Sequence, residues 1–134
     1  MFDTEEYERW LAHAKYTLES AEDDMKAGKF SWGCFKCQQA AEFALKALLY
    51  GLGSLPTGHS LIRLFNTLGE RGFKVEDLLT HARRLDRHYV PTRYPNAHAV
   101  GAPFEYYDYE TANEALNSAK AIVRMVEEAA AGCT

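Results

Sequence analysis

The residues best suited to chemistry lie in one short segment, Arg83 to Pro95, which reads RRLDRHYVPTRYP. It contains four arginines, one histidine and two tyrosines in a chain that is otherwise acidic. A guanidinium can stabilise charge that develops on a phosphate, and an imidazole can move a proton near neutral pH. Arginine also forks onto phosphate oxygens, and aromatic rings stack on bases. These residue types favour a ligand that contains phosphate, such as a nucleotide or RNA.

Two roles are predicted within this segment. The candidate catalytic residues are Arg83, as phosphate stabiliser, and His88, as acid and base. The candidate nucleotide- or RNA-binding residues are Arg84, Asp86, Arg87, Tyr89, Arg93 and Tyr94. On an ideal helix residues five apart lie about 140° around the axis, so Arg83 and His88 do not share a face. Residues four apart do share a face, which groups Arg84 with His88.

Structural alternatives exist for the same side chains. The two tyrosines can pack back onto the helices, and Arg93 can pair with Asp86 or Glu105. A stripe of His81, Arg84 and His88 lies opposite the apolar side of the expected helix and is predicted to be exposed. No Cys/His set has the spacing of a structural zinc site, so neither a metal nor a cofactor is predicted.

The overall charge limits the kind of ligand contact that is possible. The 134 residues carry a net charge of −4, and the isoelectric point is near 5.7. Electrostatic binding of nucleic acid depends on lysines and arginines that neutralise phosphates. Because the chain is acidic overall, any such contact must be confined to a small part of its surface. The acidic start lacks the pattern of a secretory signal, and the longest apolar-rich stretch carries Glu42 and Lys46. We expect a cytoplasmic protein without a membrane span.

Helical periodicity dominates the chain, and no segment alternates with the period of a strand. Apolar spacing and capping residues predict helices over about residues 4–27, 31–50, 59–68, 75–90 and 108–126. Pro91 disfavours helix at the residue before it and should end the fourth helix. A long loop is expected at about 91–107 and a flexible tail at about 130–134. The prediction is a single all-α domain spanning 1–134, an antiparallel four- to five-helix up-and-down bundle.

The second predicted helix is apolar around most of its circumference and should be enclosed by the others. Cys34 and Cys37 are therefore read as small buried hydrophobic residues and not as a redox or metal pair. Gln38, Gln39 and Glu42 on this helix can line a cleft with the Arg83 to Arg93 segment. His13 and His59 are interpreted as ordinary surface and helix-start residues.

Three stretches of the sequence resemble a known family. They are CFKCQQAAEFALKALLYGLG (residues 34–53), GHSLIRLF (58–65) and LDRHYVPTRYP (85–95). Together they look like a HEPN domain of the small stand-alone prokaryotic type, and the resemblance extends from Tyr7 to about Val126. It implies a four- or five-helix bundle, usually a homodimer, often encoded beside a minimal nucleotidyltransferase in toxin–antitoxin-like pairs.

The resemblance also bears on the candidate site. Many members are metal-independent ribonucleases that use an arginine, four to six intervening residues and a histidine. Arg83 and His88 match that spacing here, and Arg93 and His98 match it again across Pro95. Sites of this family form where two protomers meet. The resemblance therefore implies that residues of the partner chain can complete the site, although Arg83 and His88 lie on different faces of one helix. Members with a TRYP run frequently lack a strict catalytic pair.

Three functions follow as hypotheses. The leading one is a homodimer that binds a nucleotide or single-stranded RNA through Arg83, Arg84, His88 and Arg93, with a minimal nucleotidyltransferase as a candidate partner. The second is a metal-independent endoribonuclease that uses Arg83 and His88. The third is a non-catalytic interaction module that captures a partner protein.

Overall fold

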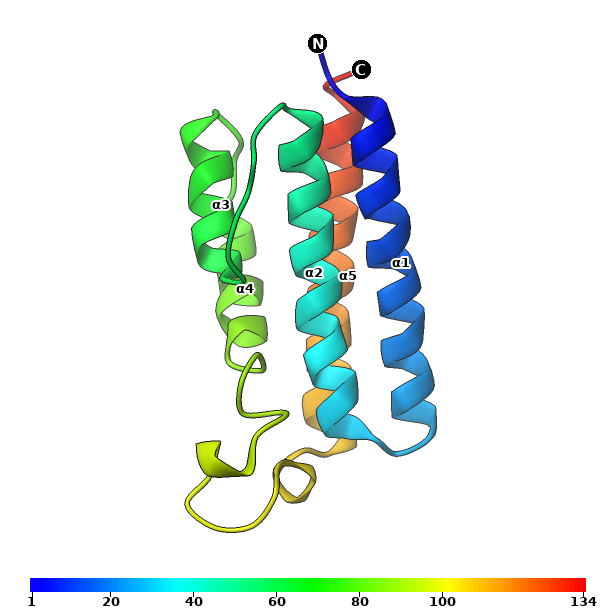
Figure 1. Ribbon diagram of the computed structural model, residues 1–134, viewed down its shortest axis with the longest axis vertical. Coiled ribbons are helices and arrows are strands. Elements are labelled where there is room, and N and C mark those ends of the chain that lie inside the picture. Colours follow the sequence, from blue (N-terminus) through cyan, green and yellow to red (C-terminus); the bar gives the residue numbers. More distant parts are fainter.

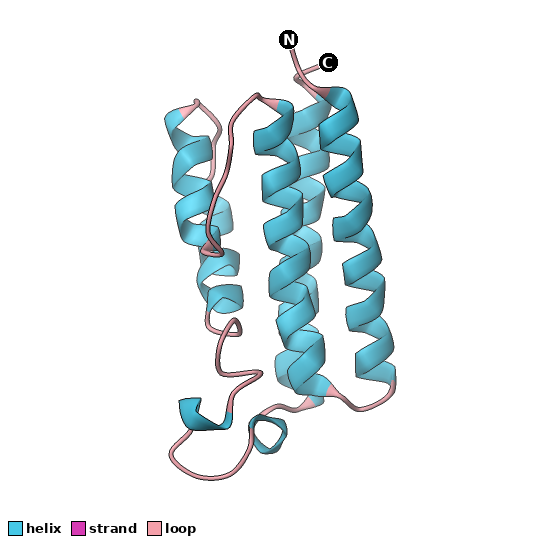
Figure 2. Ribbon diagram, viewed as in Figure 1, coloured by secondary structure: helices cyan, strands magenta, loops and turns pink.

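Five α-helices and no strand make up the protein in a computed structural model that describes residues 1–134 (Figure 1, Figure 2). The helices are α1 (Thr4–Lys26), α2 (Phe30–Gly51), α3 (Leu61–Glu70), α4 (Leu79–Asp86) and α5 (Tyr109–Ala131). Three short 3₁₀ helices accompany them: η1 (Glu76–Leu78), η2 (Pro95–Ala97) and η3 (Pro103–Tyr106). The predicted all-α bundle is confirmed.

Side-chain caps define where the long helices begin. The carboxylate of Asp3 accepts from the backbone N–H of Glu6 at 3.1 Å, and that of Asp108 accepts from Thr111 at 2.8 Å. Such caps satisfy backbone donors that the first helical turn leaves unpaired. After α1 the chain turns at Gly28, whose φ of +75° lies in the left-handed region that glycine tolerates best.

Helix α2 is the centre of the bundle, as its all-round apolar sequence predicts. It contacts α1, α5, α3 and α4, and most of its residues are buried. Cys34 and Cys37 are both buried in the core, where burial raises the pKa of the Cys34 thiol to about 12 and that of Cys37 further. The largest fully buried apolar side chains are Phe65, Leu45, Leu48, Leu49, Leu61, Leu68, Leu85, Ile122 and Val126.

The link between α2 and α3 interrupts the up-and-down alternation of the helices. Residues 52–60 run back along the bundle, so that α3 starts beside the middle of α2 and runs parallel to it (Figure 1). At the C-terminal end of α3, Arg71 donates to the hydroxyl of Ser54 and, at 3.1 Å, to the carbonyl of Leu52. Both acceptors lie at the beginning of the link. The returning link brings residues 59 and 60 next to α2.

Helix α4 is shorter than the predicted span of 75–90. It follows the 3₁₀ turn η1 and ends at Asp86. The next amides, of His88 and Tyr89, donate to the carbonyls of Leu85 and Asp86, a tighter i to i−3 pattern than that of an α-helix. Pro91 cannot donate a further helical bond, and its ring obstructs the preceding turn. His88 and Tyr89 therefore leave the faces that an ideal helix would give them.

The segment after Pro91 and the C-terminal tail also differ from the simple sequence picture. Two 3₁₀ helices, η2 and η3, shape the predicted loop of residues 91–107. Helix α5 continues to Ala131, with Ala130 buried against the core, so only the last three residues follow it. None of the helices combines the length and apolar character needed to cross a bilayer.

Asp86 joins the end of α4 to the beginning of α3. Its carboxylate accepts from the backbone amides of Leu61 at 3.0 Å and Ile62 at 3.2 Å, and from the hydroxyl of Ser60 at 3.4 Å. These two amides belong to the first turn of α3, which has no helical partner for them. Asp86 thus caps a helix that lies 25 residues earlier in the chain.

The substitution Asp86→Ala should lower the free energy of unfolding by about 1–2 kcal/mol, the usual cost of a lost helix cap. Urea unfolding of the two proteins measures this difference. Asp23→Ala removes an exposed aspartate whose side chain makes no hydrogen bond and should change stability by less than about 0.5 kcal/mol. Equal stability of the two variants would show that the contact with α3 contributes nothing.

Candidate functional site

A buried carboxylate, that of Glu42, lies at the centre of the polar residues on α2. Only 2% of its side chain is exposed. Its oxygens accept hydrogen bonds from Nζ of Lys46 at 3.0 Å and Nε2 of Gln39 at 3.2 Å. Nδ1 of His59 lies 3.1 and 3.2 Å from the two oxygens. A buried charge is tolerated only when it is paired and hydrogen-bonded. The three donors meet that requirement.

His59 faces Glu42 with one ring nitrogen and solvent with the other. Its side chain is 55% exposed, although Glu42 is almost fully buried. A carboxylate can only accept, so the proton of a neutral ring resides on Nδ1. Nε2 has no partner in the chain and retains its lone pair. An imidazole held in this way can accept a proton from a bound molecule.

The glutamines extend the contacts of Glu42 toward α4. Gln39 donates to the side-chain oxygen of Gln38 at 2.8 Å, and Gln38 donates to the backbone carbonyl of His59 at 2.8 Å and to Asp86 at 3.4 Å. The polar residues of α2 thus contact the end of α4, although the buried side chains of Gln38 and Glu42 do not line an open hollow there. We call the connected set the α2 polar network; it comprises Gln38, Gln39, Glu42, Lys46, His59 and Asp86.

Arg93 lies among three aromatic rings next to this network. Its guanidinium carbon is 4.3 Å from the ring centre of Phe35, 4.6 Å from that of Tyr89 and 4.9 Å from that of Tyr94. Nε donates to the backbone carbonyl of Tyr89 at 2.7 Å, while the terminal nitrogens bond to no group of the chain. We call Phe35, Tyr89, Arg93 and Tyr94 the Arg93 platform.

The platform and the α2 polar network meet at Tyr89. The ring of His59 stacks on that of Tyr89, with centres 4.8 Å apart and planes 19° from parallel. A small hollow of about 200 Å³ is lined by His59, Ser60, Asp86 and Tyr89. The alternative ion pairs of Arg93 do not form, because Asp86 caps α3 and Glu105 accepts from the amide of Ala102 at 2.7 Å.

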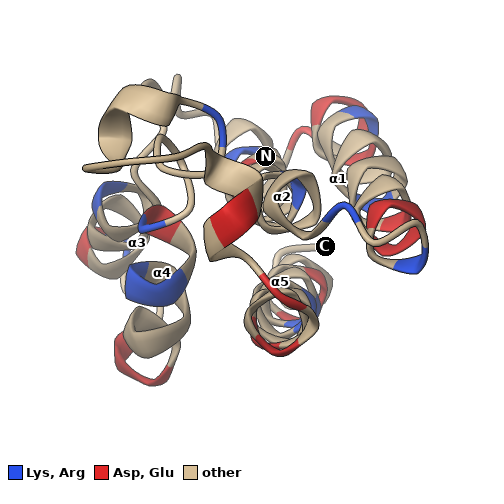
Figure 3. Cartoon of the chain, turned by 90° about the horizontal axis from the view of Figure 1, so that it is seen from below, with Lys and Arg blue, Asp and Glu red and all other residues tan.

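The predicted exposed stripe of His81, Arg84 and His88 is exposed only in part, because His88 is buried and the other two are half-buried. Helix α4 packs against both α3 and α5 (Figure 3). The buried hydroxyl of Ser118 on α5 contacts Nδ1 of His81 and accepts from Nη1 of Arg84, each at 2.9 Å. Nε of Arg84 is also 3.9 Å from Glu114. Polar side chains occupy this face because α5 offers them a buried partner.

Arg83 and His88 have very different surroundings. Arg83, like Arg87, is exposed and bonds to no group of the chain, whereas the His88 side chain is only 8% exposed. The ring of His88 packs edge-on against Tyr107 at 5.6 Å, and its Nδ1 has no hydrogen-bond partner. In a single chain, therefore, Arg83 of this predicted pair is accessible to a ligand and His88 is not.

Burial, and then the nearby charges of Arg87 and Arg84, lower the pKa of His88 to about 4, while Glu114 opposes the shift. The folded protein therefore holds this ring neutral at pH 7. The other spaced pair, Arg93 and His98, is also separated. Nε2 of His98 is 2.7 Å from the carbonyl of Pro91, and its ring stacks on Tyr106 within the loop.

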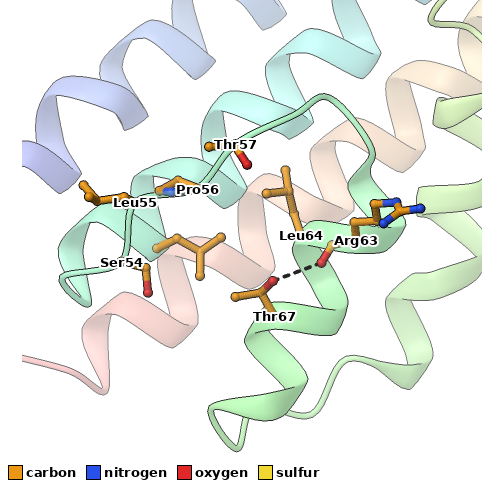
Figure 4. A pocket seen from close by; sticks show the side chains of 8 residues that line it. Ser54, Leu55, Pro56, Thr57, Arg63, Leu64 and Thr67 are labelled. Carbon is orange, nitrogen blue, oxygen red and sulfur yellow. Dashed lines mark hydrogen bonds between the residues drawn. The ribbon is translucent and has the colours of Figure 1, made fainter.

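A second hollow, of about 270 Å³, lies between the α2–α3 link and α3 (Figure 4). Its lining includes Ser54, Pro56 and Thr67, and its one charged side chain is that of Arg63. It offers no group that exchanges a proton near neutral pH. No three His, Cys, Asp or Glu side chains of the chain converge as metal ligands would. The surface around His59 and Arg93 is the stronger candidate site.

Comparison with known proteins identifies the family. The model of the HEPN domain matches residues 7–129. The chain belongs to the HEPN family. The resemblance seen in the sequence is thereby confirmed over nearly the whole chain.

Solved structures agree with this assignment. The HEPN chain is 41% identical to TT1696 from Thermus thermophilus, with a TM-score of 0.88 over 91% of this chain and 96% of that one. It is 35% identical to ST0689, an archaeal HEPN homologue, with a TM-score of 0.76 over 91% and 95% of the two chains. It is also 26% identical to a Methanocaldococcus jannaschii protein named "Putative toxin MJ1304", over 88% of each chain.

Sequence reasoning missed one residue of this candidate site, His59. It was interpreted as a helix-start residue, and it does directly precede Ser60, the residue that caps α3. The available signal was Glu42, a carboxylate on the most enclosed helix, because a buried charge needs several hydrogen-bond donors. Because the α2–α3 link runs backward, that donor is 17 residues away in the sequence.

His88 should make this HEPN fold less stable below neutral pH. The unfolded ring binds a proton near pH 6.5 and the folded ring only near pH 4, so the unfolded state binds more protons between these values. The free energy of unfolding should therefore fall by about 2 kcal/mol from this ring alone between pH 7 and pH 4.5. Urea unfolding at the two pH values measures it.

The matched variant is His88→Gln, whose side chain does not titrate. Its stability should depend less on pH over the same interval than that of the wild type. If both proteins lose the same stability, His88 does not take up the proton on unfolding.

Proposed function

We propose that this HEPN protein binds a nucleotide or single-stranded RNA where the Arg93 platform meets His59. The observation that carries the proposal is the state of Arg93. Three aromatic rings hold its guanidinium in place, yet its terminal nitrogens are unpaired. A fixed guanidinium with free donors matches the two oxygens of a phosphate.

The neighbouring groups fit the other parts of such a ligand. Tyr94 is largely exposed and can stack on a base, which is a contact available to every base. Arg83 and Arg87 add exposed positive charge close to the end of α4. The favourable charge is thus local, as the net charge of −4 requires. Arg84 and Asp86 are bound to α5 and α3, so in this proposal they position the site.

A toxin-like role, as one relative's name describes for that relative, is part of the same proposal. We further propose that the protein acts in the cytoplasm as a homodimer, alongside a minimal nucleotidyltransferase. These parts rest on the family. The catalytic use of Arg83 and His88 stays a prediction, and it requires His88 to emerge from its contact with Tyr107.

Binding of a fluorescein-labelled, twelve-nucleotide single-stranded RNA, followed by anisotropy at low salt, tests the proposal. Arg93→Ala should weaken binding about tenfold or more, because a charge-assisted hydrogen bond contributes about 1.5–3 kcal/mol. Arg93→Lys keeps the charge but loses the paired N–H donors of the guanidinium, so it should recover only part of the affinity.

Arg124→Ala is the matched control, since Arg124 is exposed on α5 and makes no ion pair. Its affinity should equal that of the wild type. The proposal is wrong if the wild type does not bind, or if Arg93→Ala and Arg124→Ala bind equally well. Thermal unfolding of each variant confirms that it is folded.

A further inference from the structure

We infer that His59 is a catalytic residue for RNA cleavage, with Nε2 accepting the proton of a ribose 2′-hydroxyl and Glu42 positioning the ring. The inference rests on the proposed function, because the RNA is the one bound at the Arg93 platform. It assigns the proton transfer to a residue outside the segment of residues 83–95. The substrate is a ribose phosphodiester, since a deoxyribose has no 2′-hydroxyl to donate.

The orientation of His59 is the first argument. Its Nδ1 is within 3.2 Å of both oxygens of Glu42, which fixes the ring and directs Nε2 to the open side. A general base needs this combination of a fixed ring, a free acceptor nitrogen and access to the substrate. His88 lacks it, because that ring is covered by Tyr107 and has no carboxylate partner.

The buried charge of Glu42 is the second argument. A carboxylate that is 2% exposed is costly to bury, and its removal from water is offset here by Lys46, Gln39 and His59 together. The fold does not need the ring of His59 to fasten the α2–α3 link, because Gln38 already holds the backbone carbonyl of His59 at 2.8 Å. The contact between the two side chains is therefore available for positioning the ring.

A contact shared with the phosphate-binding group, through the ring of Tyr89, is the third argument. His59 stacks on Tyr89 at 4.8 Å, and the guanidinium of Arg93 lies 4.6 Å from the same ring. Tyr89 thus contacts both the guanidinium that would bind the phosphate and the ring whose Nε2 is free. A cation close to the reacting phosphate stabilises the charge that builds up on its oxygens.

The step itself is a transfer within the RNA. The 2′-oxygen forms a bond to phosphorus as His59 takes its proton, and the bond from phosphorus to the 5′-oxygen breaks. The departing 5′-oxygen takes a proton from water, and His59 returns its proton to solvent. The products are a 2′,3′-cyclic phosphate and a 5′-hydroxyl, with no change in oxidation state.

The test is single-turnover cleavage of labelled single-stranded RNA in EDTA, with product ends identified by mass spectrometry. Wild type should yield cyclic phosphate ends. His59→Asn retains a donor for Glu42 but has no base, and its rate should fall at least about a hundredfold. Its affinity for a 2′-O-methyl RNA, which cannot be cleaved, should stay within about threefold of the wild-type value.

Two further variants separate catalysis from a structural role. Free imidazole should restore part of the activity of His59→Ala, which no loss of folding would allow. Glu42→Gln should lower the cleavage rate about tenfold or more with unchanged affinity for the 2′-O-methyl RNA, as expected for a positioning residue. His13→Ala, on the exposed face of α1, is the matched control and should cleave like the wild type.

The outcomes distinguish the two proposals. RNA that binds but is not cut in EDTA overturns the role of His59 and leaves the binding proposal intact. Cleavage that survives in His59→Asn and disappears in His88→Ala also overturns it and supports the pair of Arg83 and His88. Absence of any RNA binding overturns both.

Discussion

The buried carboxylate of Glu42 determines how the surface around it is arranged. It lies on the most enclosed helix, where an unpaired charge would be very unfavourable. Its partners come from its own helix, through Lys46 and Gln39, and from the link that precedes α3, through His59. The link after α2 returns to the middle of that helix, where His59 adds the third partner of the carboxylate. Helix α3 begins directly after this point, and Asp86 accepts from its first backbone amides.

Polar groups in this region divide into those that hold the fold and those that are free. Asp86 caps α3, and Arg84 and His81 share the hydroxyl of Ser118. In contrast, the terminal nitrogens of Arg93 and Nε2 of His59 have no partner in the chain. Both free groups lie against the ring of Tyr89. Buried polar groups are normally satisfied, so fixed but unsatisfied groups at a surface are the ones available to a ligand.

Much of the fold could be predicted from local patterns. Apolar periodicity and capping residues predicted the five helices, and the all-round apolar sequence identified α2 as the central helix. The resemblance to the HEPN family was also visible before the structure. The errors arose where a distant partner decides the conformation. The face of α4 that carries Arg84 looked exposed because nothing in the sequence shows that Ser118 lies opposite it.

The site was predictable only in part, for the same reason. Arg93 and Tyr89 were recognisable from their types, and Gln38, Gln39 and Glu42 were expected to line the cleft. The contact of Glu42 with His59 depends on the path of residues 52–60, and glycine and proline in a loop do not specify that path. The early end of α4 depends on a turn that begins several residues before Pro91.

The α2 polar network joins residues that are far apart in the sequence, and this affects the order of folding. Helices α1 and α2 are joined by a three-residue turn, whereas Gln38 and Asp86 are 48 residues apart. Contacts between distant residues require larger loops to close and form more slowly than local ones. We expect the α1–α2 hairpin to assemble first and the surface around Glu42 last. Until then Glu42 stays hydrated, so the cost of removing its charge from water falls in the final stage, when His59 arrives to offset it.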